Sequence, residues 1–161
     1  MAIEKAKEHL RKYGFEDRVR EFEVSSATVE LAARAVGVEP CRIAKTLSFM
    51  TKEGPVLIVA AGDARIDNHK YKAFFHTKAK MLSPEQVTEY VGHAIGGVCP
   101  FGIHDGVKVY LDESLKRFDT VYPACGSANS AVELSISELE MCSEYDGWVD
   151  VSKDETEQKT D

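Results

Sequence analysis

The feature that most constrains the fold of this chain is a β-hairpin predicted from strands at residues 46–50 and 55–61. After Pro55, the second strand is a continuous apolar run, Val-Leu-Ile-Val-Ala-Ala. Residues 51–54 supply the turn, in which Gly54 can adopt a positive φ. Because a continuous apolar run is typical of a strand covered on both faces, we expect this hairpin at the centre of a sheet.

One lysine, Lys45, stands at the start of the first strand within the largely apolar residues 43–50. Lysine is seldom fully buried without a partner. Lys45 is therefore expected either to point to solvent from the polar side of the strand or to face a polar cavity. A glycine-rich segment at residues 96–102 favours the second alternative, because glycine lets backbone N–H groups approach a ligand closely. A cation combined with backbone donors suits an ester or a phosphate-bearing substrate.

The remaining elements are predicted to be short. From apolar spacing and capping residues, helices are expected at residues 2–13, 28–36, 40–44, 67–75, 83–92 and 135–140. Strands are expected at residues 22–24, 107–111, 120–122 and 131–134. Ser26 is predicted to cap the second helix, Asp67 the fourth, and Ser83 the fifth, with Pro84 in its first turn.

Short helices scattered among strands predict a mixed α/β (α+β) fold. We expect a curved, mostly antiparallel, barrel-like sheet surrounded by short helices, rather than a doubly wound nucleotide-binding fold. Residues 1–149 are predicted to form one domain. Residues 150–161 are charged and lack apolar periodicity, so they are predicted to form a frayed tail.

The composition excludes several classes of protein. The net charge of −7 and the pI near 5.3 argue against a stand-alone nucleic-acid binder with a broad basic face. No apolar run reaches the roughly 18–20 residues that span a bilayer, and the N-terminus lacks the apolar core of a signal peptide. We therefore expect a cytoplasmic protein without a membrane partner. A local basic cluster, which is either a solvated helix face or a landing site for phosphates, comprises Lys70, Lys72, Lys78 and Lys80.

Common catalytic and metal-binding motifs are not found. The cysteines at positions 41, 99, 125 and 142 form no C-x-x-C pair, and the five histidines show no metal-ligand pattern, so no cofactor is expected. The dinucleotide-binding, P-loop and serine-hydrolase signatures are absent as well. Most of the cysteines are expected to be small buried apolar residues.

Two small-residue segments are candidates for a binding site. Residues 96–100 read Gly-x-x-x-Pro, which is either a plain connecting loop or a rigid wall whose N–H groups hold a carbonyl oxygen. Residues 124–130, Ala-Cys-Gly-Ser-Ala-Asn-Ser, are either an ordinary connection rich in turn formers or part of a pocket lining.

These motifs belong to an ordered set between about residues 25 and 140. The set comprises Ile-Ala-Lys-Thr-Leu at 43–47, Ala-Gly-Asp at 61–63, Lys-Met-Leu-Ser-Pro-Glu at 80–85 with Gly92, Gly-x-x-x-Pro-Phe-Gly at 96–102, Val-Tyr-Leu-Asp-Glu-Ser-Leu at 109–115, and Gly126 with Val-Glu-Leu at 132–134 and Leu139. It resembles the YbaK/prolyl-tRNA editing-domain family. The resemblance implies a curved, barrel-like sheet and hydrolysis of mischarged aminoacyl-tRNA, often tRNA(Pro) carrying a wrong, smaller amino acid.

The resemblance also implies roles for individual residues. Lys45 matches the functional lysine of the family, and backbone N–H groups near Gly96 and Gly97 would stabilise the oxyanion. The ester of an aminoacyl-tRNA is already activated, so water or the neighbouring ribose hydroxyl could attack it without a protein nucleophile. Cognate proline would be rejected by the size and shape of the pocket. The expected substrate-binding residues are Ile43, Thr46, Val98, Pro100, Phe101, Gly126, Ser127 and Asn129.

Two other functions are compatible with the sequence. A non-catalytic module of the same fold could recognise an aminoacyl or nucleotide end, or dock on a synthetase that brings the tRNA to an acidic protein. A cysteine-dependent hydrolase would use Cys99 or Cys125, although no His/Asp pattern accompanies either thiol. The expected partners of the deacylase are the 3′ end of an aminoacyl-tRNA and an aminoacyl-tRNA synthetase.

Overall fold

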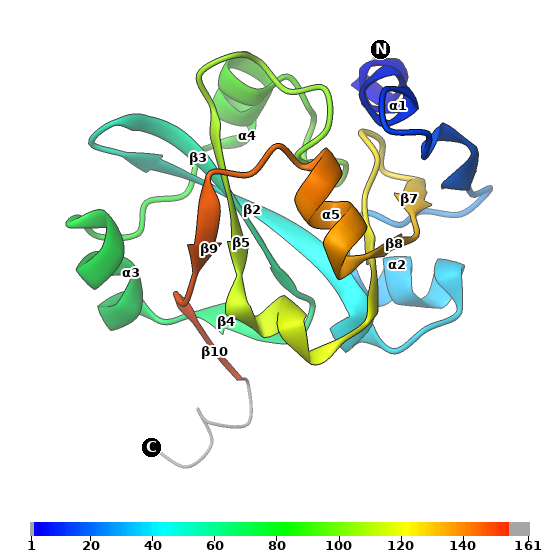
Figure 1. Ribbon diagram of the computed structural model, residues 1–161. Helices are drawn as coiled ribbons and strands as arrows, with labels where there is room; N and C mark the ends of the chain where they lie inside the picture. The colour runs from blue at the N-terminus through cyan, green and yellow to red at the C-terminus, as the bar shows by residue number, and fades with distance from the viewer. Residues whose placement is uncertain (1, 155–161) are drawn as a thin grey trace.

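The computed structural model describes residues 2–154, which are built around a six-stranded mixed sheet. In sheet order, its strands are β8 (Leu134–Ser135), β6 (Thr120–Pro123), β2 (Ile43–Thr51), β3 (Gly54–Ala61), β5 (Lys108–Asp112) and β9 (Gly147–Val149) (Figure 1). β2 and β3 pair antiparallel from Ala44 opposite Ala61 to Thr51 opposite Gly54, which confirms the predicted hairpin. β3 lies inside the sheet, and its residues 56–61 are all buried, as the continuous apolar run predicts.

Two further antiparallel strand pairs complete the β structure. β1 (Val19–Glu21) pairs with β7 (Ser130–Val132), and β4 (Ala64–Ile66) pairs with β10 (Ser152–Asp154). Within residues 2–154, four strand pairings are antiparallel, and the three parallel ones join β2 to β6, β3 to β5 and β5 to β9. The predicted α+β fold with a curved sheet and short helices is confirmed, and the parallel pairings all fall in the central sheet (Figure 1).

Short helices surround the sheet. They are α1 (Ala2–Arg11), α2 (Val29–Val36), α3 (Asn68–Phe75), α4 (Pro84–Gln86) and α5 (Ile136–Cys142), with a π-helix at Val87–Val91 and 3₁₀ turns at Glu16–Arg18, Pro40–Arg42 and Glu113–Arg117. Asp67 caps α3 and Ser83 caps α4, as predicted. Within residues 2–154, no helix is both long enough and apolar enough to cross a bilayer.

The cap of α2 differs from the prediction. Thr28, not Ser26, accepts a hydrogen bond from the Leu31 N–H at 3.2 Å. The Ser26 hydroxyl instead donates to the Ser130 carbonyl oxygen at 3.4 Å. Ser26 is thus drawn toward β7, which is distant in sequence and could not be anticipated from local capping preference.

Two strand predictions also need correction. The first short strand lies at Val19–Glu21 rather than at residues 22–24, because its register is set by β7. The strand predicted at residues 131–134 is divided between β7 and β8, which pair with different partners. Local apolar alternation carries no information about either partner.

The predicted frayed tail begins too early. Residues 152–154 form β10, and Val151 is fully buried and donates its N–H to Asp112 Oδ1 at 2.9 Å. Residues 150–154 therefore belong to the same fold as the residues before them, because pairing of β10 with β4 orders them despite their charged composition. The rest of the predicted tail, residues 155–161, lies outside the described residues.

The two faces of β2 pack against different groups. Ala44 belongs to the main core cluster on one face, whereas Leu47 packs against the cluster that contains Tyr71 of α3 on the other. Side chains alternate along a strand, so Thr46 shares the face of Ala44, and Lys45 shares the face of Leu47. This alternation decides which side chains of β2 can meet the glycine-rich loop.

Candidate functional site

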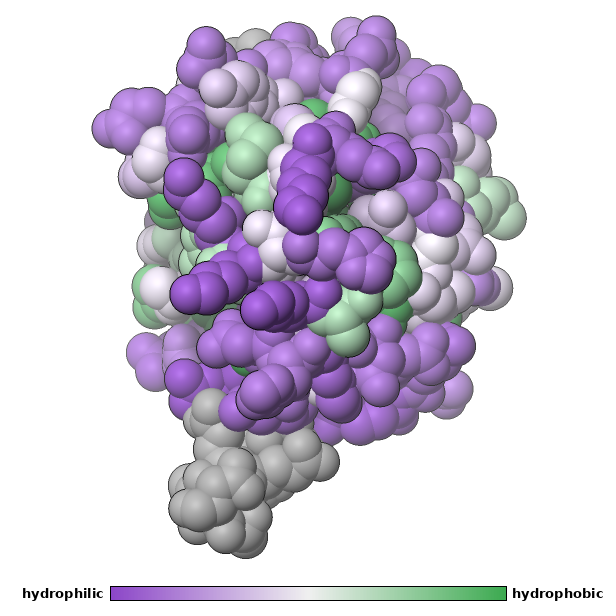
Figure 2. Space-filling model, turned by 90° about the vertical axis from the view of Figure 1, so that its left-hand side faces the viewer, coloured by the Kyte–Doolittle hydropathy of each residue, from purple (hydrophilic) through white to green (hydrophobic). Residues whose placement is uncertain are grey.

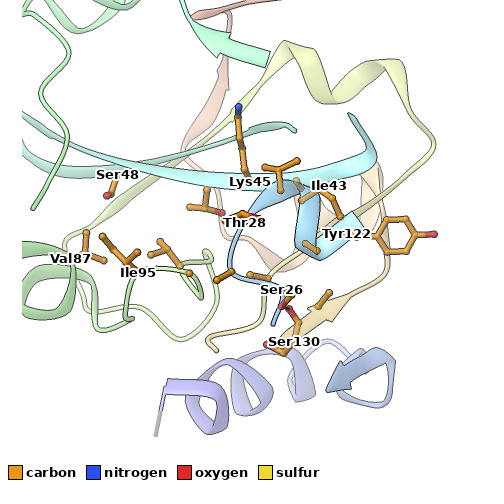
Figure 3. A pocket seen from close by; sticks show the side chains of 18 of the residues that line it. Ser26, Thr28, Ile43, Lys45, Ser48, Val87, Ile95, Tyr122 and Ser130 are labelled. Carbon is orange, nitrogen blue, oxygen red and sulfur yellow. Dashed lines mark hydrogen bonds between the residues drawn. The ribbon is translucent and has the colours of Figure 1, made fainter. Parts of the chain in front are cut away.

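A cavity of about 230 Å³ lies along β2, between the start of α2 and the loop at residues 95–98 (Figure 3). We call it the β2 cavity. Its apolar lining consists of Ala27, Val29, Ala32, Ile43, Ala44, Met81, Leu82, Val87, Ile95, Val98, Ala124 and Ala131. Its other lining residues are Ser26, Thr28, Lys45, Thr46, Ser48, Gly96, Tyr122 and Ser130. The cavity is therefore small and mainly apolar, and its lining includes several residues that carry hydroxyl groups.

Two hydroxyl groups of β2 belong to this lining. Thr46 Oγ1 is buried and has no hydrogen-bond partner among residues 2–154. Ser48 is 6% exposed, and its side chain points into the cavity (Figure 3). An unpaired buried hydroxyl costs about 1–3 kcal/mol, which a polar ligand group or a water molecule would recover. The cavity is thus suited to a small molecule that is apolar on one side and polar on the other.

The two glycine-rich segments form one wall. The Gly126 N–H donates to the Gly97 carbonyl oxygen at 3.0 Å. A Cβ on Gly97 would lie 2.6 Å from the Ser127 nitrogen, so only glycine fits this close approach. The sequence could identify each segment but not their contact.

The wall offers fewer oxyanion donors than predicted. The Gly97 N–H donates to the Ala94 carbonyl oxygen at 3.0 Å, so the assignment of Gly97 as an oxyanion donor is wrong in this geometry. Gly96 lines the cavity with a φ of +93°, and its N–H has no partner within the part of the chain that is described. Gly96 therefore remains as a donor candidate.

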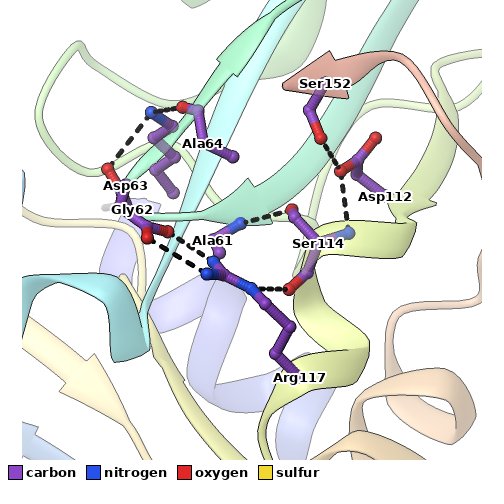
Figure 4. A network of polar contacts seen from close by, with 9 residues as sticks. Ala61, Gly62, Asp63, Ala64, Asp112, Ser114, Arg117 and Ser152 are labelled. Carbon is purple, nitrogen blue, oxygen red and sulfur yellow. Dashed lines mark hydrogen bonds and ion pairs between the residues drawn. The ribbon is translucent and has the colours of Figure 1, made fainter. Parts of the chain in front are cut away.

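The ammonium group of Lys45 lies away from the cavity. It donates to the carbonyl oxygen of Gly62 at 3.3 Å and to that of Ala64, on the other side of β2 (Figures 3 and 4). The expectation that it faces the glycine wall is therefore wrong, and the alternation of β2 gives the reason. Lys45 nevertheless borders the cavity. A Cβ on Gly62 would lie 2.8 Å from Val29, another lining residue, so the turn that holds the ammonium adjoins the cavity lining.

A salt bridge fixes the turn that receives the lysine. Arg117 Nη1 and Nη2 donate to the two carboxylate oxygens of Asp63 at 3.1 and 2.5 Å (Figure 4). The bidentate geometry holds Asp63, and with it the neighbouring Gly62 carbonyl, in a defined orientation.

The other predicted substrate-binding residues divide into two groups. Ile43, Thr46 and Val98 line the cavity. The remaining five do not line it, and are Pro100, Phe101, Gly126, Ser127 and Asn129.

Each of these five residues has a structural reason for its place. Phe101 is fully buried in the main core, and Pro100 lines a separate groove beside α1. Gly126 approaches the backbone of α1 so closely that a Cβ would lie 2.8 Å from the Ala2 carbonyl oxygen. The Ser127 hydroxyl donates to Asn129 Oδ1 at 2.9 Å, and the Asn129 amide donates to the Phe22 carbonyl oxygen at 2.9 Å. These residues hold the two glycine-rich segments in place without lining the cavity.

The matches with known proteins extend across the cavity-forming elements. Residues 23–142 match the aminoacyl-tRNA editing domain family. The chain belongs to this family. It is 54% identical over 155 residues to the uncharacterized protein YwhH of Bacillus subtilis, covering 96% of this chain and 99% of YwhH. It is also 36% identical over 90 residues to the proline–tRNA ligase of Thermosipho melanesiensis, covering 55% of this chain but only 16% of that ligase.

A solved structure supports the same assignment. A chain described as a candidate trans-editing enzyme for prolyl tRNA synthetase superposes with a TM-score of 0.85 at 30% sequence identity. The superposition covers 94% of the present chain and 97% of that chain. The YbaK-type editing family suggested by the motifs is therefore confirmed.

Several cavity residues of this editing domain were missed in the sequence. Alternation along β2 could have placed Ser48 beside Thr46, because both follow from one strand assignment. Met81 could not be found in this way, since it is brought to the cavity by an isolated bridge to Phe49. Ala27 and Thr28 reach the cavity only because α2 packs next to β2.

The cysteines of the editing domain do not form a nucleophilic site. Cys99 and Cys125 are fully buried. Burial raises the pKa of the Cys99 thiol well above its usual value and that of Cys125 to about 12. His93 Nε2 lies 3.5 Å from Cys99 Sγ, but burial lowers the pKa of His93, which disfavours an imidazolium partner for a thiolate. The geometry gives no support to the cysteine-hydrolase alternative.

We expect both thiols to be dispensable for catalysis. Cys99→Ala and Cys125→Ala should retain ester hydrolysis within about twofold and lose about 1 kcal/mol of stability each, because each removes a buried sulfur atom. Iodoacetamide at pH 8 should leave both thiols unmodified in the folded protein and label them in urea. Loss of activity in either alanine variant, while it remains folded, would support the cysteine-dependent mechanism.

Proposed function

We propose that this protein is a trans-acting aminoacyl-tRNA deacylase. It would hydrolyse the ester of mischarged tRNA, with tRNA(Pro) carrying a smaller wrong amino acid as the first candidate substrate. The observation that carries the proposal is the β2 cavity, where the unpaired Thr46 hydroxyl and the Gly96 loop enclose a small space in an editing-domain fold. The likeness to proline–tRNA ligase and to a candidate trans-editing enzyme supports the choice of tRNA(Pro).

The chemistry requires no protein nucleophile. The amino-acid side chain would occupy the apolar part of the cavity, and the Gly96 N–H would donate to the ester carbonyl oxygen as it gains negative charge. A water molecule would attack the carbonyl carbon, because attack by the neighbouring ribose hydroxyl would only move the aminoacyl group to that oxygen. With water, the bond to the ribose oxygen breaks, and the products are the free amino acid and a tRNA with a free terminal hydroxyl.

Selection against proline would depend on shape. Lys45 is the one charged residue in the described lining, and its ammonium points away, so the cavity has no charge with which to distinguish side chains. Differences of a methylene group in an apolar pocket give only about 10–200-fold discrimination. We therefore expect graded activity toward several small amino acids rather than an absolute choice.

A deacylation panel tests this function directly. The protein is incubated with tRNA(Pro) charged with alanine, cysteine, serine or proline, and then with other mischarged tRNAs, while the remaining ester is followed. The proposal predicts faster loss of at least one mischarged ester than of Pro-tRNA(Pro). Saturable binding of an aminoacyl-tRNA without hydrolysis of any ester would instead establish the non-catalytic module.

Lys45 is expected to contribute by holding the turn beside the cavity. Lys45→Ala should lower kcat/KM for a cleaved substrate by about 10–100-fold, because loss of the ammonium would release the Gly62 carbonyl and shift the turn that adjoins the lining residue Val29. Lys45→Arg keeps the charge and should recover part of the loss. Because Lys45 also binds the carbonyls of Gly62 and Ala64, melting temperatures must accompany the rates. An unchanged rate in a folded Lys45→Ala variant would remove the lysine from the mechanism.

A further inference from the structure

An acid-free segment leads to the lining residues Met81 and Leu82 of the β2 cavity. Of the 161 residues, 27 are Asp or Glu, yet none occurs between Asp67 and Glu85. The same segment contains His69, His76 and the lysines at positions 70, 72, 78 and 80. In a protein with a net charge of −7, this segment is the place where a polyanion would meet the least repulsion.

Three lysines of this segment have no carboxylate partner among the described residues. Lys72, Lys78 and Lys80 are exposed, and none forms an ion pair with another described residue. Elsewhere, cations paired with a carboxylate include Lys7, Arg11, Lys12, Arg18, Lys108, Lys116 and Arg117. The charges of the three lysines are therefore not neutralised locally, and they can bind an external anion without breaking a salt bridge.

Backbone hydrogen bonds hold one end of the segment at the cavity. The Met50 N–H donates to the Lys80 carbonyl oxygen at 2.9 Å, and the Leu82 N–H donates to the Ser48 carbonyl oxygen at 3.1 Å. Met81, between these two bonds, is 59% exposed and lines the cavity. Lys80 therefore stands next to the cavity lip, and the chain leads from it back to α3.

The face of the molecule that carries α3 has the surface expected for a polyelectrolyte partner. Figure 2 shows this face, on which hydrophilic side chains surround a smaller apolar area. Phe74 of α3 is 45% exposed and lies two residues after Lys72 in the sequence. An exposed aromatic ring among cations can stack on an unpaired base.

We propose that Lys72, Lys78 and Lys80 bind the phosphates of the tRNA acceptor end and direct its 3′ terminus to the β2 cavity. This inference rests on the proposed function, because the tRNA is its substrate. The partner is RNA rather than an acidic protein, because the lysines lie on α3 and on the connection that leads from it to a cavity sized for an aminoacyl group. Binding through phosphates is independent of sequence and strongly salt-dependent.

The test uses an uncharged, fluorescently labelled acceptor-stem minihelix, so it does not depend on ester hydrolysis. Binding is measured by anisotropy between 50 and 200 mM salt for the wild type and for the triple variant Lys72→Gln, Lys78→Gln, Lys80→Gln. We expect binding at 50 mM salt to weaken by about tenfold or more. We also expect the slope of log K against log salt to fall by about two to three units.

A matched triple variant, Lys5→Gln, Lys12→Gln, Lys116→Gln, has the same change in net charge at other places on the surface. It should bind within about twofold of the wild type. Equal weakening by both triple variants, no weakening by either, or no binding by the wild type would overturn the inference. If the wild type binds the minihelix but hydrolyses no ester in the deacylation panel, the proposed function is refuted and the inference about phosphate binding still holds. The two failures can therefore be distinguished.

Discussion

Ser48→Leu is expected to lower deacylation by at least about 100-fold while the protein stays folded. Ser48 lies on the cavity face of β2, and its side chain points into the β2 cavity (Figure 3). An isobutyl group there would occupy space next to Leu82 and Val87, where the aminoacyl group is proposed to bind. Displacing a reacting group by about 1 Å can cost roughly 100-fold in rate, and partial filling of the cavity would displace it further.

The stability of this variant should not fall in parallel. The new side chain would be surrounded by apolar atoms in a space that is already empty, so overpacking strain should be small. Ser48→Ala, which keeps the cavity open, serves as the control and should retain most of the activity. Rates on the best substrate of the deacylation panel and urea midpoints check both variants. Full activity of a folded Ser48→Leu protein would show that the β2 cavity is not where the ester is cleaved.

Asp112→Ala is expected to reduce the free energy of unfolding by about 3–5 kcal/mol. The Asp112 carboxylate is fully buried, and it accepts from the N–H of Ser114 at 2.9 Å and from the hydroxyl of Ser152 at 2.5 Å (Figure 4). The N–H of Val151 is a third donor, at 2.9 Å. Alanine would leave these donors unpaired in the interior, where each costs about 1–3 kcal/mol.

The loss should extend to the turn beside the cavity. β10 is held by Asp112 through Val151 and Ser152, and β10 pairs with β4, whose first residue, Ala64, accepts the hydrogen bond from Lys45. Urea unfolding measures the change in stability, and Asp112→Asn should lose less because it keeps one acceptor oxygen. Asp150→Ala, which removes an exposed carboxylate paired with Lys70, should stay within about 1 kcal/mol of the wild type. Equal losses for Asp112→Ala and Asp150→Ala would contradict the role of the buried network.

Much of the fold could be predicted because it depends on local signals. The hairpin of β2 and β3 follows from an apolar run and a glycine turn, and the caps at Asp67 and Ser83 follow from residues that bond to the next turn of backbone. The predictions failed where a partner distant in sequence decides the outcome. β7 sets the register of β1, and β4 orders the charged residues 152–154.

In the candidate site, too, some features could be predicted from local sequence, whereas others depend on residues distant in the chain. The sequence identified Thr46, Gly96 and Val98 as pocket residues, and all three line the β2 cavity. It misjudged Gly97 and Lys45, because the direction of an N–H or of an ammonium group depends on which neighbour accepts its hydrogen bond. Those acceptors are Ala94 for Gly97, and Gly62 and Ala64 for Lys45.

The amino-acid order by itself determined the family, the central hairpin and the two glycine-rich segments. Each of these depends on a short sequence motif whose residues interact with residues close to them in the sequence. Only the tertiary structure decided that these segments form one wall, that the hydroxyls of Thr46 and Ser48 share a cavity, and that Lys45 lies on the opposite side of its strand. The physical reason is that a strand presents alternate residues to opposite faces, and which face becomes a cavity depends on what packs against it from elsewhere in the chain.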